Sequence, residues 1–427
     1  MNLFTRYKKL FMVAGFLAIT ILLGWLLYKT FFSSGLSLDP AGQFSSTTAL
    51  CGLPISGEGT GQTSTSTGSG NFPGNADNPN GTANPLNPVN STQPNLDAPT
   101  NIALGGLTNV TPLTTSPGIG STLSPSGGVQ YYNQDDGYFY KIDQNGNAVK
   151  MSDQIFHDVS AVTWAPSKDK AILEYPDGSK IMYDFTTKKQ VSYPKYWENI
   201  SFSPQSNQVI AKSIGLDPGN RFLTVASADA SSVVNVEAIG NNADSVQASW
   251  SPNNQIVATY TQSLDFDRQE VFFVGLNGEN FKSTIVEGRG LNYTWSTTGD
   301  RLLYSVYNTR SDMKPALWIV DAQGDTISNN RQSLEINTWA DKCTFASNTE
   351  VYCGVPVNMA SGAGLVRETA DKLSDDLYKI DLTTGTKTLI AVPNGNFNVS
   401  NIMVDASQKQ LVFSDKNTGL LYKVNLK

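Results

Sequence analysis

Val162–Leu173 reads VTWAPSKDKAIL, and closely similar stretches recur at Ala248–Thr259 (ASWSPNNQIVAT) and Tyr293–Ser305 (YTWSTTGDRLLYS). In each, a short apolar run ends in Trp and is followed by Ala-Pro, Ser-Pro or Ser-Thr. Because proline has no N–H for a β-ladder, the first strand ends there. Asn, Asp or Gly then favours a turn, after which an apolar run can return as a second strand. The pattern therefore predicts a β-hairpin.

Four weaker copies complete a series of seven, and a large apolar residue takes the place of Trp164 in each. We call this the packing position; its occupants are Leu123, Trp164, Phe202, Trp250, Trp295, Phe345 and Val404, spaced by 41, 38, 48, 45, 50 and 59 residues. An alternating apolar and polar strand follows each copy, as in KIMYDFTTKK at 180–189. A repeat of about 45 residues with roughly four strands is typical of a β-propeller blade.

The sequence thus predicts an all-β fold: a β-propeller of seven blades, in which the first and last repeats together close the ring. Six or eight blades remain possible, because the first unit lacks a clear innermost strand and the last ends at Leu426 without an outer one. Trp250-Ser251-Pro252 and Trp164-Ala165-Pro166 resemble the W-S-P-D-G motif of TolB-like and WD-repeat-like propellers of bacterial envelopes. This resemblance implies architecture and leaves the ligand open, since propellers serve many functions.

An uncharged apolar run, Leu10–Tyr28, precedes the repeats and reads LFMVAGFLAITILLGWLLY. As a helix it would span about 28 Å, close to the hydrocarbon core of a bilayer. Basic residues precede it, and after Lys29 none appears until Lys141. The positive-inside rule then predicts a cytoplasmic N-terminus and an extracytoplasmic propeller at the cell membrane.

The rival interpretation is a cleaved signal peptide, which normally has a shorter apolar region and a small-x-small cleavage site. Here KTFFSSG follows the run and offers no such site. A lipoprotein is also disfavoured, because Cys51 is distant from the run and follows Leu50. We therefore expect residues 1–34 to form a basic tip and a transmembrane helix.

Residues 35–120 are rich in Ser, Thr, Asn, Gly and Pro and have few large apolar side chains. Such a segment cannot bury enough surface to offset the entropy of ordering, so we expect a disordered stalk. It is either a tether that lets the distal domain search for a partner or a plain spacer. The propeller domain is then expected at 121–427.

Two cysteines flank a predicted turn symmetrically. Cys343 and Cys353 lie at equal distances from Asn348, so in an antiparallel hairpin they would be directly opposed and able to form a disulfide. An oxidising compartment would favour the bond, and two reduced buried thiols are the alternative. Cys51 in the stalk would be a free thiol or an intermolecular link.

Catalytic signals are weak. The chain has a single histidine, His157, and no G-x-S-x-G motif, so a hydrolase triad is not expected. We expect no metal and no cofactor, since two Cys without a nearby His do not make a zinc site. The net charge of −7, without a basic cluster beyond the N-terminus, argues against a nucleic-acid partner.

Three charged loops stand out: GLDPGNR (215–221), SLDFDRQE (263–270) and NTRSDMKP (308–315). Each is expected to join the second and third strands of successive blades, so all three would emerge on one face. Loops on a rigid scaffold commonly carry recognition. The candidate binding residues are Asp217, Arg221, Asp265, Phe266, Asp267, Arg268, Arg310, Asp312 and Lys314. The competing interpretation is that these residues form ordinary salt bridges and caps within their loops, which contribute little energy.

Two functions follow from these observations. The first is a membrane-anchored scaffold of the cell envelope that binds a protein or peptide. The second is a glycan-binding or carbohydrate-active propeller. Aromatic side chains around the channel with two facing carboxylates would favour the second, whereas charged loops on one face and an empty channel would favour the first.

Overall fold

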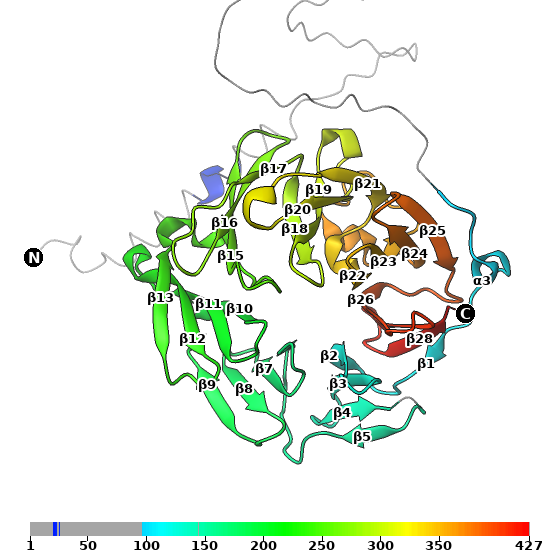
Figure 1. Ribbon diagram of the computed structural model, residues 1–427, viewed down its shortest axis with the longest axis horizontal. Helices are drawn as coiled ribbons and strands as arrows, with labels where there is room; N and C mark the ends of the chain where they lie inside the picture. The colour runs from blue at the N-terminus through cyan, green and yellow to red at the C-terminus, as the bar shows by residue number, and fades with distance from the viewer. Residues whose placement is uncertain (1–19, 24, 26–95, 144, 427) are drawn as a thin grey trace, which may run out of the picture. The chain divides into compact units, whose positions relative to one another are not determined.

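The computed structural model describes residues 20–23, 25, 96–143 and 145–426. Within 96–426 the strands form seven four-stranded antiparallel sheets, arranged as blades around a central axis (Figure 1). This confirms the expected seven-bladed propeller. In six blades the four strands follow one another from the axis outward, so each repeat of the sequence builds one blade.

The first three blades lie between residues 118 and 238. Blade 1 contains β2 (Gly118–Leu123), β3 (Val129–Asn133), β4 (Phe139–Ile142) and β5 (Ala148–Lys150). Blade 2 contains β6 (Ala161–Trp164), β7 (Lys170–Glu174), β8 (Lys180–Asp184) and β9 (Gln190–Tyr193). Blade 3 contains β10 (Trp197–Phe202), β11 (Gln208–Ile214), β12 (Arg221–Ser227) and β13 (Val233–Ala238).

Three further blades continue the same order. Blade 4 contains β14 (Val246–Ala248), β15 (Ala258–Ser263), β16 (Gln269–Val274) and β17 (Thr284–Val286). Blade 5 contains β18 (Arg289–Trp295), β19 (Arg301–Tyr307), β20 (Ala316–Asp321) and β21 (Gln332–Asn337). Blade 6 contains β22 (Cys343–Ser347), β23 (Glu350–Pro356), β24 (Asp375–Asp381) and β25 (Thr386–Ala391).

Blade 7 closes the ring with strands from both ends of the domain. Its inner strands are β26 (Val399–Val404), β27 (Gln410–Asp415) and β28 (Leu421–Asn425), and its outermost strand is β1 (Thr111–Pro112). Leu113 N–H donates to the Leu421 carbonyl at 2.8 Å and extends this pairing. The outer strand missing from the last repeat is therefore supplied by residues before 121, in the stretch that composition assigned to the stalk.

The residues preceding β1 also pack on the ring. Asp97 N–H donates to the Lys387 carbonyl and Thr100 N–H to the Leu389 carbonyl, both at 3.0 Å, along the outer edge of β25. A short helix, α3 (Asn101–Leu104), follows Thr100. We call residues 96–110 the strap. The compact unit that begins at Asn87 contains every strand of the seven sheets.

Each packing position contacts the preceding blade. Trp164 lies with Phe139 of blade 1, Trp250 with Leu223 of blade 3, and Trp295 with the aliphatic residues of blade 4. The hydrophobic core is thus divided into clusters between neighbouring sheets. This explains why the repeat requires a large apolar residue at the end of each innermost strand.

The Ser-Pro element of the repeat also has a structural role. Ser251 Oγ accepts from Ile256 N–H at 2.9 Å, and Ser296 Oγ accepts from Arg301 N–H at 3.1 Å. The serine hydroxyl therefore ties the start of the second strand to the end of the first. In blade 5 the turn needs a left-handed residue, and Gly299 provides it with φ +74°.

The expected transmembrane segment Leu10–Tyr28 lies mostly outside the described residues. Thr20–Leu23 and Trp25 are described and are helical. Within the described part of the chain, no helix has both the length and the apolar character needed to cross a membrane.

Candidate functional site

The loops between second and third strands emerge on the same face as the connections between blades. We call this the loop face, and the opposite face, which carries the hairpin turns between first and second strands, the turn face. The three predicted loops occupy equivalent places between β11 and β12, β15 and β16, and β19 and β20. The strand alternation therefore brings them to the loop face, as the sequence predicts.

The loops of blades 4 and 5 contact each other directly. Asp267 accepts hydrogen bonds from Thr309 N–H at 3.2 Å and from Thr309 Oγ1 at 2.5 Å. Thr309 begins the 3₁₀ helix η3 (Thr309–Ser311), which Asn308 and Ser311 hold in a capping box. The carboxylate of Asp267 thus fixes the position of its neighbour's loop.

Blade 6 adds a fourth loop, residues 357–374, which the sequence analysis did not select. Its Ser361 Oγ donates to Asp312 Oδ1 at 2.8 Å, and Gly362 N–H donates to the Asp312 carbonyl at 3.0 Å. Gly364 N–H donates to the Met313 carbonyl at 2.8 Å. We call the loops 264–268, 308–315 and 357–374 together the loop rim, because these bonds join them into one surface.

The blade 3 loop is less connected. Arg221 Nε donates to the Gly215 carbonyl at 3.0 Å, and Arg221 Nη2 to the Leu216 carbonyl at 3.4 Å. Asp217 precedes the 3₁₀ helix η1 (Pro218–Asn220) without a side-chain capping bond. Arg221 therefore stabilises its own loop, and nothing recorded in the described residues bonds it to the loop rim.

The charged residues of the loop rim differ in their availability. Arg268 Nη2 lies 2.6 Å from Asp265 Oδ2, and this guanidinium lowers the pKa of the Asp265 carboxyl. Lys314 Nζ lies 3.5 Å from Asp312 Oδ2. Arg310 is exposed, and the described part of the structure records no hydrogen bond or ion pair for its guanidinium. Arg310 and Lys372 are thus the exposed rim cations for which the described residues record no ion pair.

Large apolar side chains are exposed on the loop face. Phe266 is 62% exposed and lies against the Arg289 guanidinium at 4.8 Å, and Leu365 is 59% exposed. Leu264 and Val366 are also exposed, as is Leu216 on the neighbouring blade 3 loop. These exposed apolar side chains lie on successive loops of the loop face.

Two hollows lie beside the innermost strands. One, of about 400 Å³, is lined mainly by amides and hydroxyls together with Lys212 and Asp244. The other, of about 500 Å³, is lined by small and polar residues together with Trp164. Neither lining contains a pair of carboxylates or a ring of aromatic side chains, the features that would favour a carbohydrate-active site.

The channel-side strands contain bulges that the sequence pattern did not reveal. The pairing register shifts beside Gly120, Asn199, Gly290 and Asn401, all with positive φ. Asn401 Nδ2 donates to the Ser121 carbonyl at 2.6 Å and so links blade 7 to blade 1. Non-glycine residues rarely adopt this conformation, and asparagine does so more readily than most.

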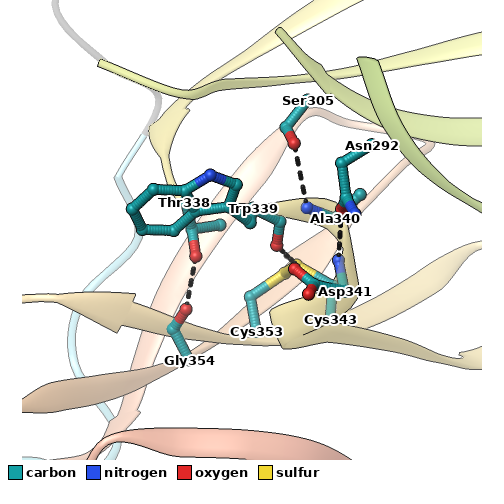
Figure 2. Close-up of a disulfide and its surroundings, with 9 residues drawn as sticks. All are labelled: Asn292, Ser305, Thr338, Trp339, Ala340, Asp341, Cys343, Cys353 and Gly354. Carbon is teal, nitrogen blue, oxygen red and sulfur yellow. Dashed lines mark hydrogen bonds between the residues drawn. A yellow bond between two sulfur atoms is a disulfide. The ribbon is translucent and has the colours of Figure 1, made fainter. Parts of the chain in front are cut away.

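The predicted disulfide is present (Figure 2). Cys343 and Cys353 are paired in register across β22 and β23, with Cα atoms 4.1 Å apart. The preceding segment is fixed by Ala340 N–H, which donates to Ser305 Oγ at 3.1 Å, and by Asp341 N–H, which donates to Asn292 Oδ1 at 2.9 Å. The bond thus lies at the channel side of blade 6.

The disulfide is connected to the loop rim through the residues before it. Arg367 of the rim lies 4.8 Å from the Trp339 ring, and its Nη1 lies 2.8 Å from Asp341 Oδ2. Both partners precede Cys343 within five residues. The disulfide and the rim therefore share one rigid support.

A buried ion pair lies beneath this support. Lys342 Nζ is 2.7 Å from Asp375 Oδ2 and 2.8 Å from Asn398 Oδ1. Burial raises the pKa of the Asp375 carboxyl to about 6 although Lys342 opposes the shift, and burial lowers the pKa of Lys342. For both partners desolvation outweighs the mutual attraction, so the pair fixes the geometry between blades 6 and 7 more than it adds stability.

Groups for catalysis are sparse in the described residues. His157 is exposed in the connection between β5 and β6. Within the described part of the chain, no cluster of three or more His, Cys, Asp or Glu side chains could hold a metal ion.

Comparisons with known proteins support the fold alone. No family model matches the chain, and no curated protein matches it. An oligogalacturonate lyase in complex with manganese superposes with a TM-score of 0.52 at 13% identity, over 74% of this chain and 93% of that one. The β-propeller domain of Cps50 (Swd1) from Myceliophteria thermophila superposes with a TM-score of 0.50 at 10% identity, over 74% and 100%. At such identities the likeness is one of architecture.

Proposed function

We propose that this propeller is a scaffold of the cell envelope that binds a protein or peptide partner through its loop rim. The observation that carries the proposal is the bonding of three successive loops by Asp267 to Thr309 and Asp312 to Ser361. A surface preorganised in this way loses little entropy when a partner binds.

The chemistry of the rim suits a protein surface. Phe266 and Leu365 offer apolar anchors, and Arg310 offers a cation that is free to pair. Aromatic and arginine side chains dominate the energetics of protein interfaces. The alternative of a glycan ligand receives less support, because the hollows beside the channel lack an aromatic platform and a carboxylate pair.

Membrane anchoring and an extracytoplasmic location complete the proposal. They are supported by the length of the uncharged run Leu10–Tyr28 and by the basic residues before it. The Cys343–Cys353 disulfide accords with an oxidising compartment. Alkaline extraction tests the anchor: the full chain should stay in the membrane fraction, and a chain beginning at Asn87 should not.

Partner capture tests the binding surface. Replacement of Arg268 and Arg310 by Ala should abolish crosslinked capture from native cells, whereas Val234→Ala should not. Val234 is a suitable control because it is 58% exposed but lies on the outer strand of blade 3. Unchanged capture by the arginine double variant would refute the role of the rim.

A further inference from the structure

The seam where the ring closes is packed differently from the seams formed by tryptophan. Trp164 stacks on Phe185 with ring centres 5.1 Å apart and fills the space between blades 1 and 2. At the closing seam the packing position holds Leu123, which contacts Met403 and Leu421 of blade 7. The closing seam contains a hollow of about 910 Å³ that Leu123 helps to line.

The hollow opens on the turn face and has an apolar floor with a polar edge. The floor is formed by Leu113, Leu123, Val129, Ile142, Met403 and Val412. The edge is formed by the first turns of blades 1 and 7, including Ser126 and Ser407. Small-molecule sites commonly have this size and this combination of an apolar lining with a few polar groups.

The charged groups around the hollow favour an anion. The two carboxylates that line it accept hydrogen bonds from their own hairpin turns. Asp143 accepts from Asn147 N–H at 2.8 Å, and Asp405 accepts from Gln410 N–H at 2.7 Å. Lys409 and Lys423 line the same hollow, and the described residues provide neither with an ion pair. The lysines are thus the charges left available to a ligand.

A third lysine extends this group. Lys141 Nζ donates to Ser126 Oγ on the edge of the hollow and likewise has no ion pair among the described residues. Ammonium groups form their strongest hydrogen bonds with anionic oxygens. An apolar floor beside such groups suits a ligand with an apolar body and an anionic end.

We propose that the closing seam is a binding site for a free amphipathic carboxylate, with its alkyl chain on the apolar floor and its carboxylate at Lys409 and Lys423. The site lies on the face opposite the loop rim, so it is independent of the proposed partner surface. The proposed ligand carries a single alkyl chain, because the hollow is bounded by the turns of two blades.

Methionine methyl groups provide a direct test in a chain beginning at Asn87. Met403 lines the hollow, whereas Met182 is buried between blades 2 and 3. With ¹³C-methyl methionine labelling, octanoate should shift the Met403 signal and leave Met182 unchanged. Octan-1-ol, which has the same chain without the charge, should bind about tenfold more weakly. Equal responses to the two probes, or equal shifts at both methionines, would overturn the proposal.

Variants locate the site. Leu123→Trp introduces the side chain found at three other seams into the hollow and should abolish the Met403 response; a persistent response would contradict the proposal. Should this variant fail to fold, the double variant Lys409→Gln and Lys423→Gln should weaken octanoate about tenfold and leave octan-1-ol unchanged. Lys188→Gln is the matched control, because Lys188 lies in a hairpin turn of blade 2 outside the hollow.

An anionic lipid membrane also presents alkyl chains with an anionic group, so it is the other source of a ligand for this site. Vesicles of anionic phosphatidylglycerol should leave Met403 unshifted at lipid concentrations where octanoate shifts it. A shift with vesicles and none with octanoate would overturn the assignment to a free carboxylate.

Discussion

Removal of the strap and of β1 should open the ring. A chain beginning at Gly118 keeps all strands of blades 1–6 but loses the outermost strand of blade 7. The deleted residues include Asp97, Thr100 and Leu113, whose N–H groups donate to carbonyls of blades 6 and 7. We therefore expect a large loss of stability from a deletion outside the repeats.

The magnitude follows from the bonds that are lost. Six of these bonds involve the N–H groups of Asp97, Thr100, Leu113 and Thr108, the Thr108 carbonyl and Thr114 Oγ1. At a net contribution of about 1 kcal/mol each, the six bonds amount to about 6 kcal/mol. Whole domains are typically stable by only about 5–15 kcal/mol, so the truncated chain should be marginal or unfolded.

Urea unfolding followed by tryptophan fluorescence would measure the effect against a chain beginning at Asn87. Leu113→Pro, which removes the donor to the Leu421 carbonyl, should cost about 1–3 kcal/mol without any truncation. Leu104→Ala is the control, since Leu104 is 66% exposed on α3 and should change stability by less than about 0.5 kcal/mol. Equal midpoints for the chains beginning at Asn87 and Gly118 would refute the closure argument.

Three further outcomes can be measured by the same unfolding assay. Lys342→Met should cost about 3–5 kcal/mol because it leaves the Asp375 carboxylate buried without its cation, and a loss below about 1 kcal/mol would contradict this. Because the folded-state pKa of Asp375 is raised to about 6, the stability that this carboxyl contributes falls as pH rises from about 4 to 6. Wild type should therefore lose about 3 kcal/mol relative to Asp375→Asn between about pH 3 and pH 7, and a pH-independent difference would exclude the shift. Replacing Cys343 and Cys353 by Ser should cost about 2–3 kcal/mol in the entropic model, whereas equal midpoints with and without reductant would show that the bond adds nothing.

The repeat pattern allowed the blades to be predicted, because each needs a large apolar residue at its packing position and a turn after its first strand. The disulfide was predictable for a similar reason, since Cys343 and Cys353 are symmetric about a turn. For the closure of the ring, the sequence indicated only that the last repeat lacks an outer strand, and it did not identify β1 as the strand that supplies it. Thr111 and Pro112 carry no alternating pattern, and two residues are too few to produce one.

The connected surface of the loop rim could be predicted only in part. Loop positions follow from strand alternation, so the sequence placed Asp267 and Asp312 on one face. Their partners Thr309 and Ser361 depend on loop conformation, which a periodic pattern does not encode. The loop at 357–374 has few charges at its start, and its length between β23 and β24 was the available signal.

Site-specific photo-crosslinking tests the proposal of a partner-binding loop rim most directly. A crosslinking residue placed at Phe266 in the full chain should capture one discrete partner in native cells, and the same residue at Val234 should not. Both positions are exposed and apolar, at 62% and 58%, so they differ mainly in their place on the ring. Capture at Val234 equal to that at Phe266, or no capture at Phe266, would contradict the account.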